Sequence, residues 1–232
     1  MPPLPGLPEV EITLRRSARA RRISLRVSSL DGRVTLTLPA RARESEGMAF
    51  LRDRADWIRA ALARVPPPRA PGPGGILPIE GRGVPVLAGP ARGPVRVTPE
   101  GLVVPGDPAL AGPRIAAFLK ALARGRLASA CDRHAAALGR PYSRLVLRDT
   151  RSRWGSCTTA GVLMFNWRLV MAPPEVLDYV AAHEVAHLAE MNHSPAFWAV
   201  VARLMPQHAA PRAWLRAEGN ALHGWQFGPR GD

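Results

Sequence analysis

Two histidines and a glutamate in the C-terminal third of the chain have the spacing of a hydrolytic metal site. His183, Glu184 and His187 form the pattern H-E-x-x-H, in which the histidines are four residues apart. On a helix this spacing puts both imidazoles on one face, one turn apart, where they can bind the same metal ion. Glu184, which lies between them, can then act on a water molecule at that ion. We therefore predict a zinc-binding helix with Glu184 as general base and then acid.

A third ligand is expected, because a catalytic zinc site commonly takes three protein ligands and keeps one position open. We predict His193 as this ligand, with Glu190 as the competing candidate. The resulting spacing, H-E-x-x-H-x5-H, is that of the metzincin motif, but the glycine that turns the chain in that motif is absent. Asn192 tolerates the left-handed conformation and is expected to make the turn. His208 and His223 are expected at the surface.

The composition indicates a folded, strongly basic protein. Hydrophobic residues make up 47% of the 232 residues, which is enough for a buried core. The net charge is +14, from 32 basic and 18 acidic residues, and Lys120 is the one lysine. A nucleic-acid or nucleotide partner would explain this charge, and so would an arginine-rich coding bias that also favours Ala, Gly and Pro. The sequence leaves both explanations open.

Two cysteines, Cys131 and Cys157, make neither a disulfide framework nor a CxxC metal motif. The N-terminal residues show no signal-peptide pattern, and no run of about eighteen apolar residues predicts a membrane span. We therefore expect a protein of the reducing cytoplasm that does not enter a membrane.

Hydrophobic periodicity predicts a strand-rich N-terminal half and a more helical C-terminal half. The expected strands cover residues 9–14, 23–27, 34–38, 76–79, 84–87, 95–97, 102–104, 143–148 and 162–170. The expected helices cover residues 44–65, 115–138, 173–190, 195–204 and 212–222. Asp31-Gly32 is a hairpin turn signal. The basic connection Arg15–Arg22 is expected to be a solvated hairpin loop, with contact to phosphates as the alternative. Trp57 is expected in the core.

The proline- and glycine-rich stretch 66–75 cannot hold regular hydrogen-bonded structure, so it is the best candidate for a domain boundary. We expect a β-rich N-terminal region with one helix over residues 1–110, which either forms a separate domain or packs onto the rest. The catalytic domain is expected over residues 111–232, with helix 115–138 supporting the metal helix from behind.

Further motifs occur in order around the histidines: Arg148-x4-Arg153-Trp154-Gly155-Ser156-Cys157, Asn166-Trp167-x-Leu169, Asp178-Tyr179-Val180, Asn192-His193-Ser194 and Phe197-Trp198. Together they resemble the YgjP-like metallopeptidase family, which is related to the SprT type of zinc protease. The segment Arg22–Val27 and the helix around Trp57 are also similar, so the resemblance covers roughly Ile12 to Leu222.

This resemblance implies an α+β fold with a zincin-like metalloprotease domain. In such a domain the zinc helix lies beside a small sheet whose edge strand receives an extended peptide, and residues 162–170 are our candidate for that strand. The resemblance also implies one Zn²⁺ ion held by His183, His187 and His193, with Glu184 as the catalytic acid and base.

The polar segment 151–157 is not explained by packing alone. Arg151 and Arg153 are candidates for contacts to an anionic substrate or an oxyanion, with structural ion pairs as the alternative. Trp154 and Asn166 are further candidates for substrate contacts. No histidine partner that would make Cys157 a nucleophile can be argued from the sequence.

We expect a zinc-dependent hydrolase that cleaves peptide bonds in a peptide or protein substrate. One alternative, which the resemblance also implies, is a pyrophosphatase that acts on nucleoside triphosphates such as UTP; the arginine surplus suits such a substrate. The other is a DNA-associated zinc protein without enzymatic activity. Glu184 argues against this last hypothesis, because a structural zinc site needs no general base.

Overall fold

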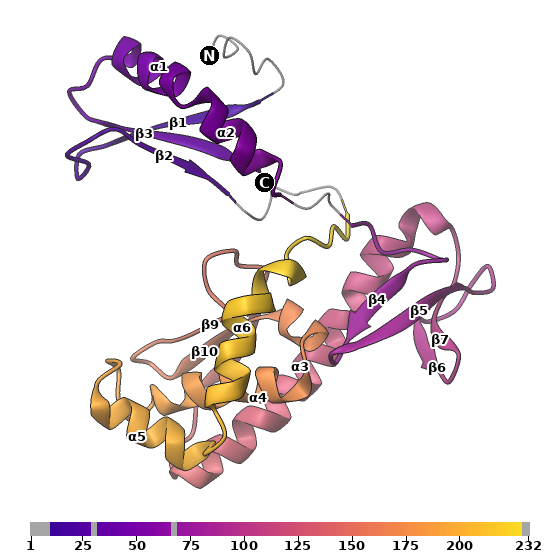
Figure 1. Cartoon of the computed structure of the whole chain (residues 1–232). Coiled ribbons are helices and arrows are strands. Elements are labelled where there is room, and N and C mark those ends of the chain that lie inside the picture. The colour runs from indigo at the N-terminus through magenta and orange to yellow at the C-terminus, as the bar shows by residue number, and fades with distance from the viewer. Residues whose placement is uncertain (1–9, 29–31, 66–68, 229–232) are drawn as a thin grey trace. The chain divides into compact units, whose positions relative to one another are not determined.

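The computed structural model describes residues 10–28, 32–65 and 69–228, and the chain divides into two compact units (Figure 1). The N-terminal unit is Met1–Pro68 and the C-terminal unit is Arg69–Asp232. The division falls in the proline-rich stretch predicted as a boundary, of which residues 66–68 lie outside the described part. Helices and strands occur in both units, so the predicted α+β class is confirmed.

The N-terminal unit is a three-stranded sheet with two helices on one face (Figure 1). The central strand β3 is parallel to β1 and antiparallel to β2, which confirms the expected pairing of the second and third strands. The turn residue Asp31 lies outside the described residues. The elements are β1 (Ile12–Ser17), β2 (Ser24–Val27), β3 (Val34–Pro39), α1 (Glu44–Asp53) and α2 (Ala55–Leu62).

The helix expected over residues 44–65 is interrupted at Arg54, whose backbone has φ −107° and ψ 10°. The interruption resets the phase of the second helix, so that Ile58 is buried against the sheet. Trp57, the preceding residue, consequently points outward and is 46% exposed. The expectation that Trp57 belongs to the core was therefore wrong.

The C-terminal unit opens with a four-stranded sheet in the order β4-β5-β7-β6. These strands are β4 (Ile76–Ile79), β5 (Arg82–Ala88), β6 (Arg96–Thr98) and β7 (Gly101–Val104). The helices that follow are α3 (Ala111–Leu138), α4 (Pro174–Ala186), α5 (Pro195–Leu204) and α6 (Ala209–Leu222), with short 3-10 turns η1 (Pro108–Leu110) and η2 (Trp167–Met171). Gly139 ends α3 in the left-handed conformation at φ 73°, as its position predicts.

The boundary expected at residue 110 lies inside the C-terminal unit. The turn between β4 and β5 is bonded to η2: Glu80 N donates to Val170 O at 2.8 Å and Gly81 N to Met171 O at 3.2 Å. Strands β4, β5 and β7 also bury Leu77, Val86 and Leu102 in the same core as α3 and α4. The first sheet of this unit therefore shares its core with the helices.

The second sheet of the unit has the order β8-β10-β9, with β8 (Arg144–Arg148), β9 (Gly155–Cys157) and β10 (Val162–Asn166). The candidate edge strand 162–170 was wrong on two points. Its first half, β10, is the central strand, parallel to β8 and antiparallel to β9. Its second half turns into η2, where Asn166 accepts a hydrogen bond from Arg168 N through its side chain. β9 is an edge strand of this sheet.

Helix α3 lies along α4, as expected from the order of elements (Figure 1). The two helices share a polar contact in which Asp178 accepts from His134 Nε2 at 2.9 Å and from Arg133 at 3.0 Å. Just after α3 ends, Arg140 donates to Leu188 O, two residues beyond the end of α4, at 2.7 Å. The C-terminal end of α3 and the residues after it thus hold the predicted metal helix near its start and just past its end.

None of the helices in the described part of the chain combines the length and the apolar character that a membrane crossing requires.

We expect Asp178→Asn to lower the free energy of unfolding at pH 7 by about 1–3 kcal/mol, because two donors lose a charged acceptor. The hydrogen bond from His134 lowers the pKa of Asp178 below its ordinary value of 3.8. The ionised pair therefore stabilises the fold above pH 3.8, and this contribution is lost as the pH falls through the lowered pKa. Denaturant unfolding at several pH values should show the difference between variant and wild type shrinking in acid.

Glu175→Gln, which changes an exposed carboxylate on the same helix, is the matched control and should change stability little at any pH. A difference between Asp178→Asn and wild type that stays constant from pH 7 into acid would contradict the assignment.

Candidate metal centre

The metal motif lies at the end of α4, a helix that is buried over most of its surface. His183 and Glu184 lie in its last turn, and His187 follows directly as the C-terminal capping residue with φ −64° and ψ −17°. Since His187 keeps helical dihedrals, the i, i+4 geometry of the two histidines is preserved beyond the end of α4.

The chain turns back after His187 without a left-handed residue. Leu188 N donates to Val185 O at 2.9 Å and Glu190 N donates to Ala186 O at 3.1 Å. Among the described residues that are not glycine, only Glu80 has a positive φ. The expectation that Asn192 makes a left-handed turn was therefore wrong; helical-type bonds carry the chain on to Glu190, and the segment to Ser194 uses negative φ values. Ser194 then caps α5 by accepting from Phe197 N at 3.3 Å.

Three histidine rings converge at this turn, one ligand atom from each within 4.8 Å of the others. His183 Nε2 and His193 Nε2 face each other at 3.0 Å. Two imidazole nitrogens on one tetrahedral zinc ion lie about 3.3 Å apart, given Zn–N bonds of about 2.0–2.1 Å. The residues present therefore fit a metal ion of this size.

Hydrogen bonding and burial leave the histidines ready to act as ligands. His187 Nδ1 lies 2.9 Å from Glu190 O, and because a carbonyl can only accept, Nδ1 carries the proton and Nε2 keeps its lone pair. Burial lowers the pKa of His183 to about 3 and also lowers that of His187, so both rings are neutral at pH 7. Glu190, the competing ligand, contributes its carbonyl to this arrangement.

The walls of the centre are aromatic. Phe197 stacks on His187 with ring centroids 4.5 Å apart, and Trp198 lies 5.9 Å from His183. Tyr179, one turn earlier on α4, contacts His183 edge-on at 5.9 Å. These rings restrict the orientation of the imidazoles and reduce the access of water.

Glu184 is enclosed between α4 and β9. Its side chain is 5% exposed, and burial raises the pKa of its carboxyl to about 8, with the positive charge of Arg153 acting against this. A Cβ atom added at Gly155 would lie 2.4 Å from Glu184 Oε1. The carboxylate therefore occupies the space that a larger side chain would need at position 155.

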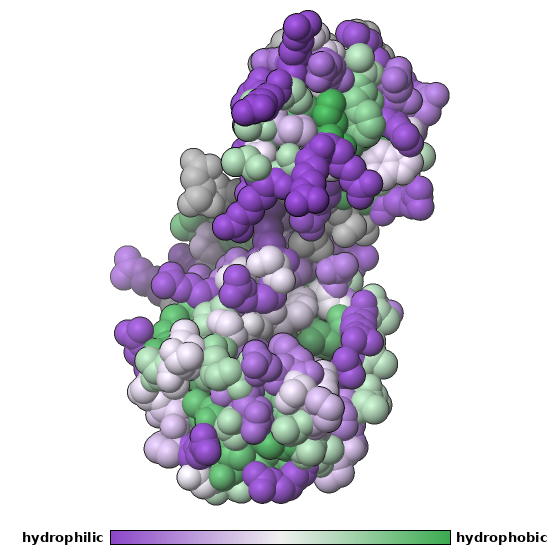
Figure 2. Space-filling model, turned by 90° about the vertical axis from the view of Figure 1, so that its left-hand side faces the viewer, coloured by the Kyte–Doolittle hydropathy of each residue, from purple (hydrophilic) through white to green (hydrophobic). Residues whose placement is uncertain are grey.

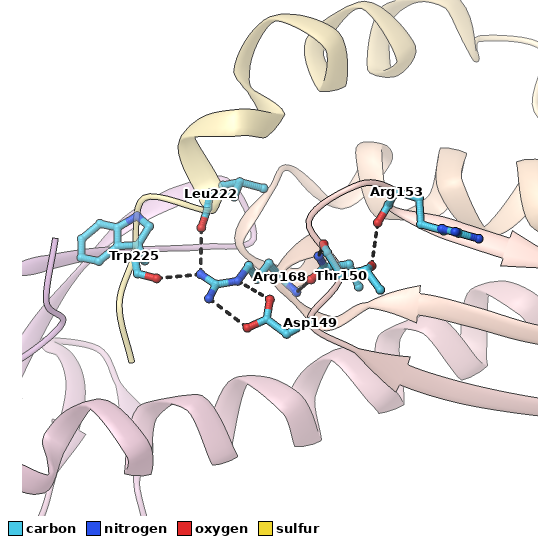
Figure 3. A network of polar contacts seen from close by, with 7 residues as sticks. Asp149, Thr150, Arg153, Arg168, Leu222 and Trp225 are labelled. Atoms are coloured by element: carbon cyan, nitrogen blue, oxygen red, sulfur yellow. Dashed lines mark hydrogen bonds and ion pairs between the residues drawn. The ribbon is translucent and has the colours of Figure 1, made fainter. Parts of the chain in front are cut away.

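A buried arginine holds the loop that leads into β9 (Figure 3). Arg168 is 8% exposed and binds both carboxylate oxygens of Asp149, at 2.7 and 3.0 Å. Its Nη1 also donates to the carbonyl oxygens of Leu222 and Trp225, at 3.0 and 2.8 Å. One guanidinium thus connects η2, the loop after β8 and the segment after α6.

The same loop is held by Asn166 and by its own threonine. Asn166 is fully buried, and its Nδ2 donates to Thr150 O at 2.6 Å. Thr150 Oγ1 in turn donates to Arg153 O at 2.8 Å (Figure 3). Asn166 was a candidate for substrate contact, but both ends of its amide bond the main chain and it has no exposed surface.

Trp154 is fixed from α6. Its ring stacks on His223 with centroids 4.7 Å apart, and a Cβ atom at Gly219 would lie 3.3 Å from it. His223 was expected at the surface, but it is partly buried, and this burial lowers its pKa to about 4. The roles of Arg168 and His223 were not predicted, because no local pattern relates them to residues 149–154.

The remaining candidates lie around the centre. Arg151 and Arg153 are exposed, and the charge of Arg153 reaches Glu184. Cys157 is half-buried, and burial together with the charge of Glu184 raises its pKa to about 11. At neutral pH it is therefore a thiol, the form that is weak as a nucleophile.

We expect His193→Ala to lower zinc affinity by more than the ~10–100-fold that loss of an outer-shell partner causes. His193 is exposed, so its replacement should leave the fold intact. Zinc titration in competition with a chelator, with thermal unfolding measured in parallel, checks both points. His208→Ala removes a histidine outside the cluster and should leave affinity unchanged. Equal zinc affinity of His193→Ala and wild type would disprove the ligand assignment.

We expect Gly155→Ala to reduce catalytic efficiency by about 100-fold, because the methyl group displaces the Glu184 carboxylate. Zinc content should be unaffected, since the histidines do not contact position 155. Gly125→Ala is the matched control, because no atom lies within 4 Å of a Cβ there. Retention of full activity by Gly155→Ala would show that the carboxylate is not confined by β9.

Comparison with known proteins identifies the family of the chain. A family model described as YgjP-like, metallopeptidase domain matches residues 21–218. The crystal structure of the metallopeptidase zymogen of Pyrococcus abyssi abylysin is 20% identical in sequence, with a TM-score of 0.36, and the match covers 40% of this chain and 92% of that chain. No curated protein matches the chain. Because the family model spans most of the sequence, the chain belongs to the YgjP-like metallopeptidase family.

Proposed function

We propose that the chain is a zinc-dependent peptidase that uses Glu184 as its general base and acid. Membership of the family makes it a metallopeptidase-type hydrolase and implies a divalent metal. The observation that carries the finer proposal is the position of Glu184. Glu184 follows His183 of the three-histidine cluster directly in the chain, and its carboxylate is buried against the main chain of an edge strand.

His183, His187 and His193 would hold the metal ion through imidazole nitrogens. When bound, a zinc ion acts as a Lewis acid toward a carbonyl oxygen and lowers the pKa of water to ~7. The choice of zinc rests on the ligand set, because three imidazole nitrogens suit Zn²⁺ better than Mg²⁺ or Ca²⁺, which prefer oxygen ligands.

Glu184 would take a proton from the attacking water and pass it to the leaving amine. Burial makes this carboxylate a stronger base than an exposed glutamate, since its pKa is raised to about 8. Nearby positive charge, including that of Arg153, favours its ionised form. Gly155 leaves room for the carboxylate against β9, because a side chain at this position would occupy the same space.

The edge of β9 provides main-chain groups for an extended substrate. Trp154 O accepts from Asn166 N at 2.8 Å and Thr158 N donates to Val162 O at 3.1 Å, so these residues face β10. Main-chain groups alternate in direction along an antiparallel strand, and those of Gly155 and Cys157 consequently face the open edge. A peptide added there by β-augmentation would run past Glu184. β9 therefore replaces residues 162–170 as our candidate for the edge strand that receives the substrate.

Hydrolysis of nucleoside triphosphates is a second candidate function, and one observation favours it. Two arginines act on the centre through their charge: Arg153 acts on Glu184, while Arg212 of α6 acts on His183. Arg212 is held with its guanidinium carbon 4.2 Å from the centre of the Trp198 ring. Arginines in such positions can bind the oxygens of a triphosphate.

We expect Glu184→Gln to reduce the cleavage of casein by about 10²–10⁴-fold, the typical contribution of a general base. Zinc content should be unchanged, because glutamine keeps the shape of the side chain and the three histidines remain. The zinc-loaded protein is incubated with casein and separately with UTP, and both new N-termini and pyrophosphate are measured.

Glu175→Gln, on the exposed first turn of α4, makes the same chemical change outside the centre and should retain full activity. Loss of pyrophosphate release in Glu184→Gln, without any proteolysis by wild type, would establish the second candidate in place of the first. Turnover of neither substrate by the zinc-loaded wild type would contradict both.

A further inference from the structure

The sheet of the N-terminal unit has one apolar face and one polar face. In the register of the sheet, Ile12 pairs with Val34 and Leu25 with Leu36, and these residues pack against α1 and α2. The intervening residues point the opposite way, since side chains alternate along a strand. They form two cross-strand rows, Arg15–Thr37–Ser24 and Thr13–Thr35–Arg26.

This face, which we call the arginine-threonine face, holds two arginines and four hydroxyl side chains. No helix of the described N-terminal unit covers it, because α1 and α2 occupy the other side (Figure 1). The four positions on its two outer strands are exposed, and the two central threonines are partly exposed. Arg15 and Arg26 lie on opposite edges, about 12 Å apart, because two strand spacings across the sheet combine with a shift of two residues along it.

Charge is unevenly distributed around this face. Residues 12–28 contain six arginines and no carboxylate. The carboxylates of the described N-terminal unit lie at Glu11, just before β1, and on the helices at Glu44, Glu46, Asp53 and Asp56. Within the described residues, no ion pair joins Arg15, Arg19 or Arg26 to a carboxylate. Figure 2 shows hydrophilic side chains over much of the visible surface of this unit.

The loop between β1 and β2 adds further positive charge beside the arginine-threonine face. Its arginines at positions 19, 21 and 22 are exposed. Arg16 is different, because its Nη1 donates to Ala40 O and Ala42 O, at 3.2 and 2.8 Å, and so holds the chain between β3 and α1. The arginines of the face and the loop thus have no comparable structural role, and their clustering calls for another explanation.

We propose that the arginine-threonine face and the adjoining loop 18–22 bind the phosphate backbone of a nucleic acid. Guanidinium groups bind phosphate oxygens in a bidentate manner, and serine and threonine hydroxyls add hydrogen bonds to the same oxygens. The face carries no aromatic side chain on which bases could stack, so binding is independent of sequence and sensitive to salt. It carries no large apolar residue either, which disfavours insertion into a lipid surface.

The test compares two double variants that remove the same charge from the intact chain. Arg15→Gln with Arg26→Gln removes the arginines of the face. Arg52→Gln with Arg64→Gln removes two exposed arginines of the helical side. Binding of a fluorescent DNA duplex and of the matching single strand is measured by anisotropy over a range of salt concentrations.

We expect the first double variant to weaken binding at every sequence tested and to reduce the slope of log K against log salt by about 1.4–1.8, for two phosphate contacts. The second should change the slope by much less. Equal effects of the two variants would overturn the proposal, because diffuse net charge would then explain the binding. Undetectable binding of either DNA by the wild type at low salt would also overturn it.

Two further measurements distinguish nucleic-acid binding from membrane binding and from the proposed peptidase activity. Vesicles containing anionic phospholipid replace the DNA in a parallel titration, and binding to vesicles without binding to DNA would assign the face to a membrane surface instead. Glu184→Gln should bind DNA as the wild type does, since the proposal does not depend on the peptidase activity. The midpoint of thermal unfolding is measured for each variant, to check that glutamine at these exposed positions leaves the fold intact.

Discussion

The C-terminal unit depends on one buried charge. Arg168 is removed from water in a turn between the central strand and the metal helix, and a buried guanidinium without partners would cost several kcal/mol. The chain supplies a carboxylate from Asp149 and two carbonyl oxygens from residues 222 and 225. The ring centroids of Trp167 and Phe227 lie 4.9 and 5.2 Å from its guanidinium carbon and 5.1 Å from each other, so the two rings pack together beside the guanidinium. Satisfying this one group therefore brings three distant segments together.

The candidate active centre follows from that arrangement. Once Asp149 is bound to Arg168, the loop that follows has little freedom, and Asn166 and His223 bind it at Thr150 and Trp154. The loop delivers Gly155 to the end of α4, where its main chain lies against Glu184. The positions of the three histidines depend on other contacts, namely the packing of α4 on α3 and the turn after residue 187. The proposed metal ligand His183 and the proposed general base Glu184 thus share α4, while β9 adds the contact that confines the Glu184 carboxylate.

The N-terminal unit is built on a different principle. Its small core is closed on one side only, by two helices whose apolar residues meet the alternate residues of three strands. Gly47 shows how close this packing is, since a Cβ atom there would lie 2.9 Å from Leu38. The residues of the opposite face do not belong to this core, so apolar packing does not determine their types. Arginine and threonine at those positions are consistent with recognition of an anionic polymer.

Local pattern alone determined much of this protein. Features that involve only neighbouring residues can be predicted from the sequence. They include the H-E-x-x-H spacing, the periodicity of the strands and helices, and the capping residues Gly139 and Ser194. The convergence of His193 on His183 was predictable because only a short turn separates them. The edge strand was misplaced for the opposite reason, since an apolar run such as 162–166 can lie at the centre or at the edge of a sheet.

The tertiary structure decided everything that depends on distant segments. It placed β9 beside Glu184, put residues 76–104 into the core of the C-terminal unit, and turned Trp57 outward after the break at Arg54. Above all it brought Arg168 to residues 149, 222 and 225, which are separated from it by 19, 54 and 57 positions. Burial of a charge is a property of the whole fold. A local periodic pattern therefore does not predict which distant residues will form hydrogen bonds and ion pairs with that charge.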